Sequence, residues 1–320
     1  MKILVTGANG FVGTALCKQL LASGIEVHAA TRSGSTLPSS EPLRVFTVGE
    51  LGQNPDWLPA LTGVDAVIHL AARVHLMNDD AIDPLREYLK INVEATLNLA
   101  RQAAAAGVKR FVYLSSIKVN GEFTSKGKPF RETDITNPQD SYAISKLRAE
   151  EGLRTLAAET GMEVVIIRPP LIYGPGVKAN FAKLLKCVDK GIPLPLGAVA
   201  NKRSFIFVDN LCDALLKCVT HPAAAGRTYL ISDGNDISTA ELVEAMALAL
   251  NRPVRLLSVP VSLIRTAAKT VGRGAVVDRL TQSLVVDSSN ISKDLEWCPP
   301  YTVAHGLGVT AEWYRSGRKI

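Results

Sequence analysis

The chain has 320 residues, of which 47% are hydrophobic and 21% are charged, with a formal net charge of +6. This composition excludes a disordered or low-complexity protein, and the length favours one large domain with a smaller one beside it. The lysines and arginines are scattered and form no basic run interleaved with aromatics, so a small anionic ligand is expected and nucleic acid is not.

The start of the chain and its apolar runs predict neither a secretion signal nor a transmembrane segment. The stretch "MKILVTGANG" has no charged leader before a long apolar core. No apolar run approaches the roughly 20 residues that a bilayer requires. The five cysteines are dispersed and never form a C-x-x-C pair, and the five histidines lack metal-ligand spacing. We therefore expect a cytoplasmic protein without disulfides or a metal.

Short β-branched runs alternate with helical patterns over the first 170 residues. The runs are "KILVTG", "EVHAAT", "LRVFTV", "AVIHLAA", "RFVYLSS" and "EVVIIRP". The clearest helical patterns between them are "FVGTALCKQLLASG" and "EYLKINVEATLNLARQAAAAG". Strands that are apolar on both faces and separated by helices form a parallel sheet with helices on each side. We predict a Rossmann-type doubly wound α/β domain over residues 1–170.

Three glycines follow the first strand at once, in "LVTGANGFVG". Gly7, Gly10 and Gly13 permit a tight turn and let the backbone approach a pyrophosphate. The helix beyond them supplies free N–H groups and the positive end of its dipole. A turn without a ligand is the alternative. The position after a strand, before a helix and at the start of a βαβ unit favours a dinucleotide.

The second strand ends in "AATRSGS", where an acidic residue would accept hydrogen bonds from the adenosine ribose of NAD. Thr31 occupies that position and Arg32 follows it. A cation beside hydroxyl groups, with no carboxylate in this stretch, suits a 2′-phosphate and favours NADP over NAD. The alternative is that Arg32 stacks on adenine, which would not distinguish the two cofactors.

The strand "RFVYLSS" ends in Ser115 and Ser116, and the next long helix begins with "SYAISK". Tyr142 and Lys146 are four residues apart, so they share one face of that helix. A neighbouring ammonium and an oxidised nicotinamide would lower the pKa of the phenol by ~3 units. Tyr142 could then exchange a proton with a sugar hydroxyl while Ser116 hydrogen-bonds the reacting oxygen. An amphipathic helix with a half-buried tyrosine is the alternative.

The pattern changes after "RPPLIYGPG", where turn-rich pieces alternate with helices. One helix is predicted to start at Ser238, because "STAE" has the form of a capping box. We predict a smaller α+β lobe over residues 171–320 that binds the substrate, with the chain free to cross back between the lobes. The segment "VSLIRTAAKTVGR" is interpreted as a helix that covers this lobe's core, and a helix on a membrane surface is the alternative.

Together these motifs resemble the extended short-chain dehydrogenase/reductase superfamily and, within it, the UDP-glucose 4-epimerase-like nucleotide-sugar enzymes. The resemblance runs nearly from end to end. It rests on "TGANGFVG", "HLAA", "NVEAT", "SSIKVNGE", "SYAISK", "IIRPPLIYGPG" and "RSFIFVDN". It implies a nucleotide-sugar substrate, whose uridine is inferred from this likeness alone. It also implies a NAD or NADP cofactor and a place in polysaccharide biosynthesis, and it leaves a homodimer open.

The same resemblance assigns site residues one by one. It makes Ser116, Tyr142 and Lys146 catalytic, and Lys146 would also hold the nicotinamide ribose. The cofactor-binding residues would be Gly7, Gly10, Phe11, Val12, Gly13, Thr31, Arg32, Leu70, Ala71, Ala72, Asn92, Tyr142 and Lys146. The substrate-binding residues would be Ser116, Asn180, Arg203 and Arg279, the last as the nearest candidate for a second arginine on the diphosphate.

Several positions depart from the family pattern. Related dehydratases carry an acidic pair that removes water, and Ile117 and Lys118 stand there, so dehydration is not expected. Asn120 replaces the usual tyrosine, and Ala95 replaces a glycine without blocking the backbone path. Thr31 replaces the aspartate of the NAD-bound epimerases.

Three functions follow from these observations. The first is a 4-epimerase that oxidises and reduces carbon 4 of a nucleotide hexose reversibly. The second is a one-way NAD(P)H-dependent reductase of a 4-keto-6-deoxy nucleotide sugar. The third is a dinucleotide-binding sensor without catalysis, which the retained serine, tyrosine and lysine disfavour. Family likeness favours the epimerase, whereas Thr31 and Arg32 favour the reductase.

Overall fold

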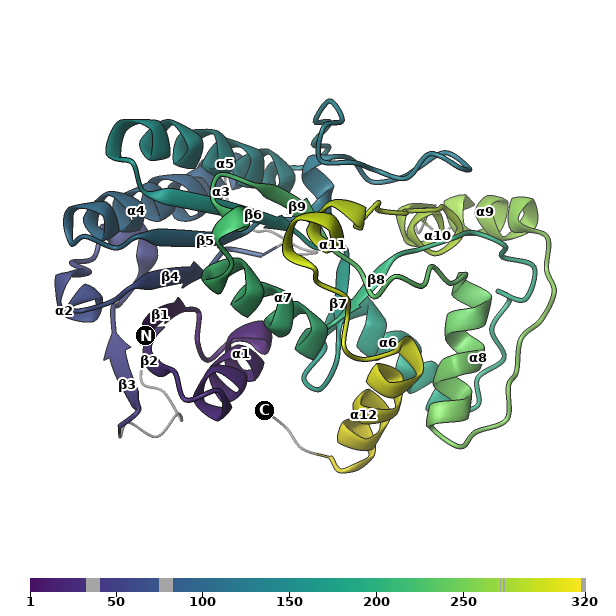
Figure 1. Cartoon of the computed structure of the whole chain (residues 1–320). Helices are drawn as coiled ribbons and strands as arrows, with labels where there is room; N and C mark the ends of the chain where they lie inside the picture. Colours follow the sequence, from purple (N-terminus) through teal and green to yellow (C-terminus); the bar gives the residue numbers. More distant parts are fainter. Residues whose placement is uncertain (33–40, 75–82, 271, 273, 318–320) are drawn as a thin grey trace.

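The computed structural model describes residues 1–32, 41–74, 83–270, 272 and 274–317. A seven-stranded sheet of order β3-β2-β1-β4-β5-β6-β9 runs through the molecule, and each neighbouring pair of strands is parallel (Figure 1). The strands are β1 (Lys2–Thr6), β2 (Glu26–Thr31), β3 (Leu43–Thr47), β4 (Ala66–His69), β5 (Arg110–Leu114), β6 (Glu163–Arg168) and β9 (Thr228–Leu230). The six runs predicted as strands are β1 to β6, so the doubly wound α/β fold is confirmed.

Helices cover both faces of this sheet. One face carries α1 (Phe11–Ala22) and α7 (Val208–Thr220), and the other carries α3 (Pro84–Leu89), α4 (Ala95–Ala105) and α5 (Ser141–Thr160) (Figure 1). The strand order reverses between β1 and β4, which are hydrogen-bonded neighbours. In open α/β sheets the carboxyl ends of the strands at such a reversal form the ligand crevice.

The chain crosses back to this sheet after it has entered the second lobe, since β9 pairs with β6 and α7 packs on α1. Arg110 on β5 anchors the return. Its Nη1 donates to the carbonyls of Cys218 and Val219 near the end of α7 and to that of His221 just after it, at 3.1, 2.9 and 2.6 Å. Its Nη2 lies 2.6 Å from Glu163 on β6. The buried guanidinium thus satisfies carbonyls that a helix end leaves unpaired.

The second lobe is built around a two-stranded parallel sheet of β7 (Leu171–Tyr173) and β8 (Phe205–Phe207). Its helices are α6 (Ala179–Asp189), α8 (Thr239–Ala249), α9 (Val261–Thr270), α10 (Gly274–Thr281) and α12 (Val303–Arg315), whereas α11 (Ser289–Leu295) packs against β9 of the large sheet. The capping box predicted at Ser238 is present, because Ser238 Oγ accepts from Glu241 N and Glu241 Oε2 accepts from Ser238 N.

The segment predicted as a covering helix forms α9, which packs against α10. Ala268 is buried and Leu263 is exposed, so the helix has one face toward the lobe and one toward solvent. In the part of the chain that the structure describes, no helix is both long and apolar enough to cross a membrane. The shorter elements are α2 (Leu58–Leu61), a π-helix (Lys90–Glu94) and 3₁₀ turns at Leu51–Gln53, Ile117–Val119 and Pro222–Ala224.

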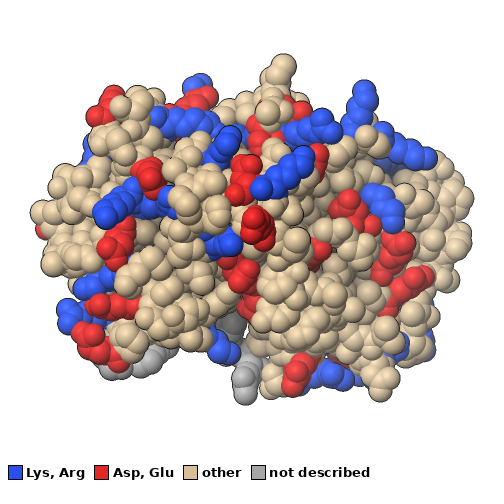
Figure 2. All heavy atoms as spheres, viewed as in Figure 1, with Lys and Arg blue, Asp and Glu red and all other residues tan. Residues whose placement is uncertain are grey.

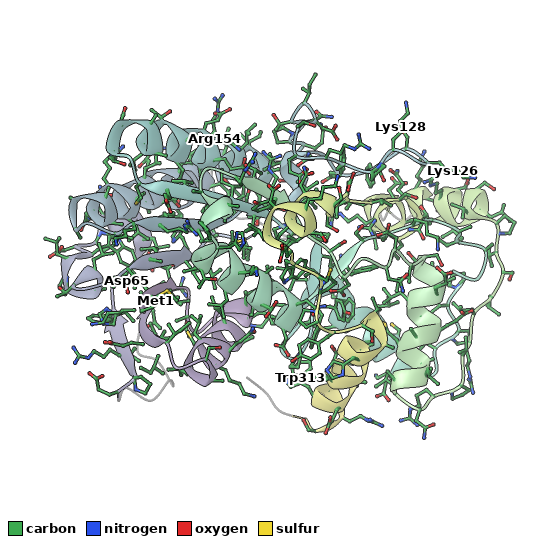
Figure 3. The ribbon with its side chains drawn as sticks, viewed as in Figure 1. Met1, Asp65, Lys126, Lys128, Arg154 and Trp313 are labelled. Carbon is green, nitrogen blue, oxygen red and sulfur yellow. The ribbon has the colours of Figure 1, made fainter. Side chains whose placement is uncertain are left out.

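Residues 121–140 form an arm that extends from the first lobe and pairs with segment 283–287 of the second. Thr124 N donates to Ser283 O at 2.8 Å, and Phe130 N donates to Val285 O at 2.8 Å. Lys126 and Lys128 project from the arm into solvent (Figure 3). On the face drawn in Figure 2, basic and acidic side chains are interspersed and no large surface of one sign is formed.

Candidate active site

The glycine turn between β1 and α1 is fixed by close backbone contacts. Gly7 has a φ of +64°, and a Cβ there would lie 3.1 Å from Ala71 Cα. A Cβ on Gly13 would lie only 2.1 Å from Gly7 O, and Gly10 N donates to that same oxygen at 2.9 Å. Helix α1 begins after Gly10, which has no side chain to cap it. Its first N–H groups therefore stay available to an anion, as a pyrophosphate cradle requires.

Thr6 connects this turn to the segment after β4. Its Oγ1 accepts hydrogen bonds from Leu70 N and Ala71 N, both at 3.1 Å, and lies 2.7 Å from His69 Nδ1. Because Thr6 already accepts twice, its hydroxyl donates to Nδ1, and the opposite nitrogen Nε2 donates to Thr96 Oγ1 at 2.9 Å. Burial lowers the pKa of His69 to about 3, so the ring is neutral. Sequence reasoning missed this hydrogen-bonded chain.

A cavity of about 420 Å³ opens beside the glycine turn and contains several predicted cofactor residues. Thr31 and Arg32 line it from β2, and Ala72 lines it from the opposite side. The Thr31 hydroxyl is buried and has no hydrogen-bond partner among the described residues. An unpaired buried hydroxyl is costly, so a polar ligand atom at this point would relieve it.

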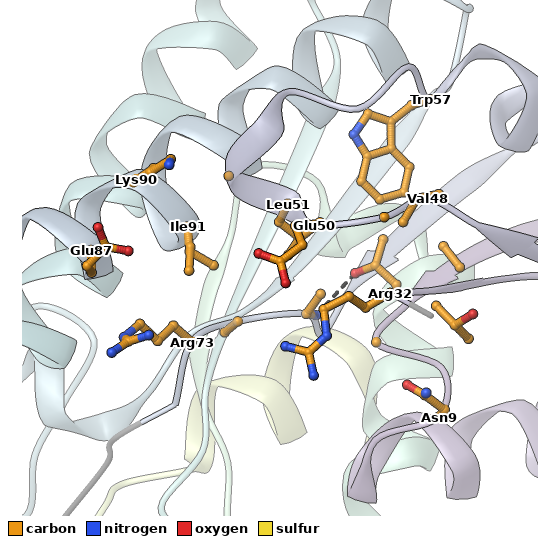
Figure 4. Close-up of a pocket in the computed structure, with 18 residues that line it drawn as sticks. Asn9, Arg32, Val48, Glu50, Leu51, Trp57, Arg73, Glu87, Lys90 and Ile91 are labelled. Carbon is orange, nitrogen blue, oxygen red and sulfur yellow. Dashed lines mark hydrogen bonds between the residues drawn. The ribbon is translucent and has the colours of Figure 1, made fainter. Parts of the chain in front are cut away.

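Glu50 and Trp57 also line the cavity, and sequence reasoning missed both (Figure 4). The side chains of Glu50 and Arg32 point toward the same space (Figure 4). The sequence stretch around Thr31 contains no carboxylate, but the folded site does. Glu50 supplies it from the segment that follows the neighbouring strand β3. The rule that strand ends gather at one sheet edge could have found it.

Asn92 lies in the π-helix and is buried. Its Oδ1 accepts from Arg73 N at 2.8 Å, and its Nδ2 donates to Arg73 O at 3.0 Å and to Ser145 Oγ at 2.9 Å. Asn92 thus ties the segment after β4 to the helix that carries Tyr142. Its amide is occupied by these protein partners, and its predicted place along the cofactor stays a prediction.

Ser116, Tyr142 and Lys146 are brought together at the carboxyl end of β5. Ser116 follows the strand, and its side chain is near enough to lower the pKa of Tyr142. Lys146 Nζ donates to Leu114 O at 2.8 Å and lies over two rings, 4.5 Å from the centroid of Tyr113 and 5.9 Å from that of Tyr142. The predicted grouping of three residues on two elements therefore exists in the fold.

Taken together, the protein's own groups raise the pKa of Tyr142, and the lowering expected from Lys146 together with an oxidised nicotinamide stays a prediction. Burial raises this pKa above its usual range, the charge of Asp140 raises it further, and the hydrogen bond from Ser116 opposes both. Burial also lowers the pKa of Lys146 to about 7, against the attraction of Glu150. Desolvation outweighs the ammonium beside the phenol.

A buried ion pair supports the catalytic elements from behind. Arg168 on β6 donates from Nη2 to Glu150 Oε2 at 2.6 Å, and Ser115 Oγ donates to Glu150 Oε1 at 2.5 Å. Arg168 Nη1 donates to Asn120 Oδ1 at 2.9 Å. Asn120, which replaces the family's usual tyrosine, therefore completes a hydrogen-bonded network instead of facing a ligand. Ser115 likewise holds the α5 helix in place.

The two positions of the dehydratase acidic pair have other contacts. Ile117 is buried in an apolar cluster with Leu230, Leu284 and Val286, which belong to the later part of the chain. Lys118 Nζ lies 2.5 Å from Asp140 Oδ2. Neither side chain can act as an acid–base pair for water loss. Among the described residues, no group of three or more His, Cys, Asp or Glu side chains is placed to hold a metal ion.

Two of the three predicted phosphate-binding residues of the second lobe are in contact. Arg203 Nη1 donates to Arg279 O at 2.9 Å and to Gln282 O at 3.1 Å, which leaves two further nitrogens on the guanidinium. Arg203 also bridges Leu284 through the backbone, next to the cluster that contains Ile117. Asn180 lies at the start of α6 and is half-buried.

Comparisons with known proteins agree with this geometry. The model of the NAD dependent epimerase/dehydratase family matches residues 3–232. A UDP-glucose 4-epimerase from Vibrio cholerae is 46% identical over 312 residues, which cover 97% of this chain and 94% of that protein. A solved structure of MoeE5 in complex with UDP-glucuronic acid and NAD matches with a TM-score of 0.79 at 26% identity and covers 99% of this chain and 100% of that one. A UDP-glucose 4-epimerase of Thermotoga maritima, at 22% identity and a TM-score of 0.80 over 99% of both chains, shares the fold.

Proposed function

The chain belongs to the NAD dependent epimerase/dehydratase family of enzymes, and we propose that it is a 4-epimerase of a UDP-linked hexose. The observation that carries the proposal is the meeting of Ser116, Tyr142 and Lys146 at the carboxyl end of β5, in the same sheet whose first strand leads into the glycine turn. The 46% identity to the Vibrio cholerae UDP-glucose 4-epimerase supports the choice of reaction.

The chain's own residues fit a dinucleotide. Backbone N–H groups at Phe11, Val12 and Gly13, in the first turn of α1, would meet the pyrophosphate. The glycine at position 13 lets the turn and the helix come this close, since a Cβ there would fill the space between them. The cavity beyond the turn would hold the adenosine. When bound, the nicotinamide supplies a hydride acceptor and, in its oxidised form, a positive charge.

Tyr142 would move the proton at the sugar's 4-hydroxyl, and Ser116, which acts on the pKa of Tyr142, would hydrogen-bond and orient that oxygen. Lys146 is anchored by Leu114 O, so its ammonium is held beneath the phenol and can also reach a ribose hydroxyl. A buried cation over an aromatic ring is attracted to it, which keeps Lys146 in place.

Cofactor choice would be set by two opposed charges. Arg32 attracts the 2′-phosphate of NADP, and Glu50 in the same cavity repels it and can accept a hydrogen bond from an unphosphorylated adenosine. The sequence alone favoured NADP because only Arg32 was visible. With Glu50 in the cavity, neither NAD nor NADP is favoured over the other. The reductase stays the second candidate, because Arg32 suits an NADPH that exchanges in each turnover.

The second lobe would bind the nucleotide diphosphate through Arg203 and Arg279, with Asn180 nearby. The forked guanidinium of Arg203 suits phosphate oxygens, and its backbone bridge to Leu284 brings it next to the cluster around Ile117 and so toward Ser116. The division into lobes at about residue 171, the homodimer and the cytoplasmic location stay predictions.

A test with purified protein separates the two candidate reactions. UDP-glucose or UDP-galactose is added without external cofactor, and the products are resolved by anion-exchange chromatography. Interconversion at catalytic turnover supports the epimerase, because its dinucleotide is regenerated in each cycle. No interconversion, together with reduction of a 4-keto-6-deoxy nucleotide sugar at the expense of one NADPH per product, would establish the reductase, and Tyr142→Phe serves as the inactive control for both.

A further inference from the structure

A buried hydrogen-bonded chain connects the end of β1, just before the glycine turn, to helix α4. Thr6 Oγ1 lies 2.7 Å from His69 Nδ1, and His69 Nε2 lies 2.9 Å from Thr96 Oγ1. All three side chains are buried. The backbone N–H groups of Leu70 and Ala71 both donate to the same Thr6 oxygen at 3.1 Å. The chain therefore also holds the segment that follows β4.

The protons in this chain are arranged in one direction. A hydroxyl group has two lone pairs and one proton. Because two backbone N–H groups use both lone pairs of Thr6, its proton goes to His69 Nδ1. The imidazole then carries its own proton on Nε2 and donates it to Thr96. Burial, and after it the charge of Lys146, lowers the pKa of His69 to about 3, which agrees with this neutral ring.

Two aromatic rings fix the orientation of the imidazole. His69 stacks on Tyr113 with the ring centroids 5.9 Å apart, and it packs at a tilt against Phe111 at 5.8 Å. A ring held on its faces in this way keeps both nitrogens pointed at their partners, as a positioning role requires. Tyr113 also lies beneath Lys146, so the same stack extends to the proposed catalytic lysine.

The segment that Thr6 holds forms part of the proposed cofactor cavity. Thr6, Gly7, Ala71 and Ala72 all line this cavity. A Cβ on Gly7 would lie 3.1 Å from the N and Cα atoms of Ala71, so the glycine turn and the segment are in direct contact. Without an acceptor at Nδ1, the Thr6 hydroxyl would turn its proton elsewhere and lose one of the two N–H groups. The cavity wall would then shift against the turn.

We propose that His69 is a positioning residue for the dinucleotide: it accepts the Thr6 proton, so that both lone pairs of Thr6 hold residues 70 and 71 against the glycine turn. The inference rests on the proposed dinucleotide site. His69 acts through Thr6, which lines the cavity, and does not itself touch the ligand.

Two amide variants of His69 separate its two hydrogen bonds. In His69→Asn the amide oxygen takes the place of Nδ1 and accepts the Thr6 proton. In His69→Gln the longer chain brings the amide nitrogen to the place of Nε2 and leaves Thr6 without its acceptor. Fluorescence titration with NADH and with NADPH should show the parent affinity for His69→Asn and about tenfold weaker binding for His69→Gln.

Thermal unfolding of the same two variants distinguishes positioning from packing. Asparagine is smaller than glutamine and leaves the larger void in the core, so His69→Asn should have the lower Tm. Dinucleotide affinity and stability should therefore rank the two variants in opposite orders. Affinity for UDP, measured by calorimetry, should stay at the parent value in both, because the proposed diphosphate residues lie in the second lobe.

His28 provides a matched control on β2, because it is also buried and its Nδ1 lies 2.7 Å from Ala60 O. His28→Gln should lower the Tm and leave dinucleotide affinity unchanged. Thr6→Val, which has the same shape without the hydroxyl, should reproduce the loss seen in His69→Gln, and Thr6→Ser should retain binding. This pair decides the question if His69→Gln does not fold.

Two results would overturn the role of His69 while leaving the dinucleotide site intact. One is equal dinucleotide affinity in His69→Asn and His69→Gln, and the other is parent affinity in Thr6→Val. Failure of the parent protein to bind either NADH or NADPH would instead reject the dinucleotide site, and the inference with it.

Discussion

Replacing Gly13 by alanine tests whether the glycine turn is the cofactor cradle. The added Cβ would lie 2.1 Å from Gly7 O and within 2.9 Å of two backbone atoms of Ala8, and real Cβ atoms essentially never come nearer than 3.0 Å. All of these neighbours are backbone, so no side chain can rotate away. The turn itself has to move by about 1 Å, an overpacking that costs about 1–3 kcal/mol of stability.

The same displacement moves N–H groups that would face the pyrophosphate. Loss of one hydrogen bond to a charged group is worth about 1.5–3 kcal/mol, or roughly ten- to a hundredfold in affinity. Fluorescence titration with NADH measures the change, and urea unfolding measures the stability. Gly308→Ala is the matched control. Its Cβ on α12 meets nothing within 4 Å, so it should raise stability by about 0.5–1 kcal/mol and leave NADH binding unchanged. A Gly13→Ala protein with the parent's NADH affinity would refute the assigned cradle.

The remaining predictions concern the chemistry, the cofactor and the diphosphate. Tyr142→Phe should lower turnover by roughly a hundredfold or more with NADH affinity kept, since only the proton-transfer group is lost; near-normal turnover would contradict the mechanism. Arg32→Ala should weaken NADPH binding roughly ten- to a hundredfold more than NADH binding, and Glu50→Gln should favour NADPH instead; equal changes for both cofactors would show that neither charge is selective. Arg203→Lys should weaken UDP binding by about tenfold in calorimetric titration, because lysine lacks the fork that also holds Arg279 O; an unchanged UDP affinity would place the diphosphate elsewhere.

The parts of the fold that could be predicted from the sequence are those set by local patterns. The strands, the glycine turn and the capping box at Ser238 depend on neighbours within a few residues, and each is found where the pattern put it. The return of α7 and β9 to the first sheet depends on the buried Arg110, which pairs with carbonyls more than a hundred residues away. Hydrophobic periodicity along the sequence cannot predict a contact between residues so far apart in the chain.

The candidate site divides in the same way. The spacing of Tyr142 and Lys146 predicted their shared helix face, but not that burial would dominate the pKa values of both. Glu50 was missed because its relation to Arg32 exists only once β2 and β3 are paired. Desolvation and cross-strand proximity are properties of the packed chain, so they are not visible in a linear motif.

The central claim, reversible hydride transfer at carbon 4, is tested most directly with UDP-glucose that carries deuterium at that carbon. The purified protein is incubated without added cofactor, and the product is examined by mass spectrometry and proton NMR. The account predicts UDP-galactose with deuterium retained at carbon 4, because the hydride leaves and returns within one active site. Absence of UDP-galactose, or product in which the deuterium is replaced by hydrogen, would contradict it.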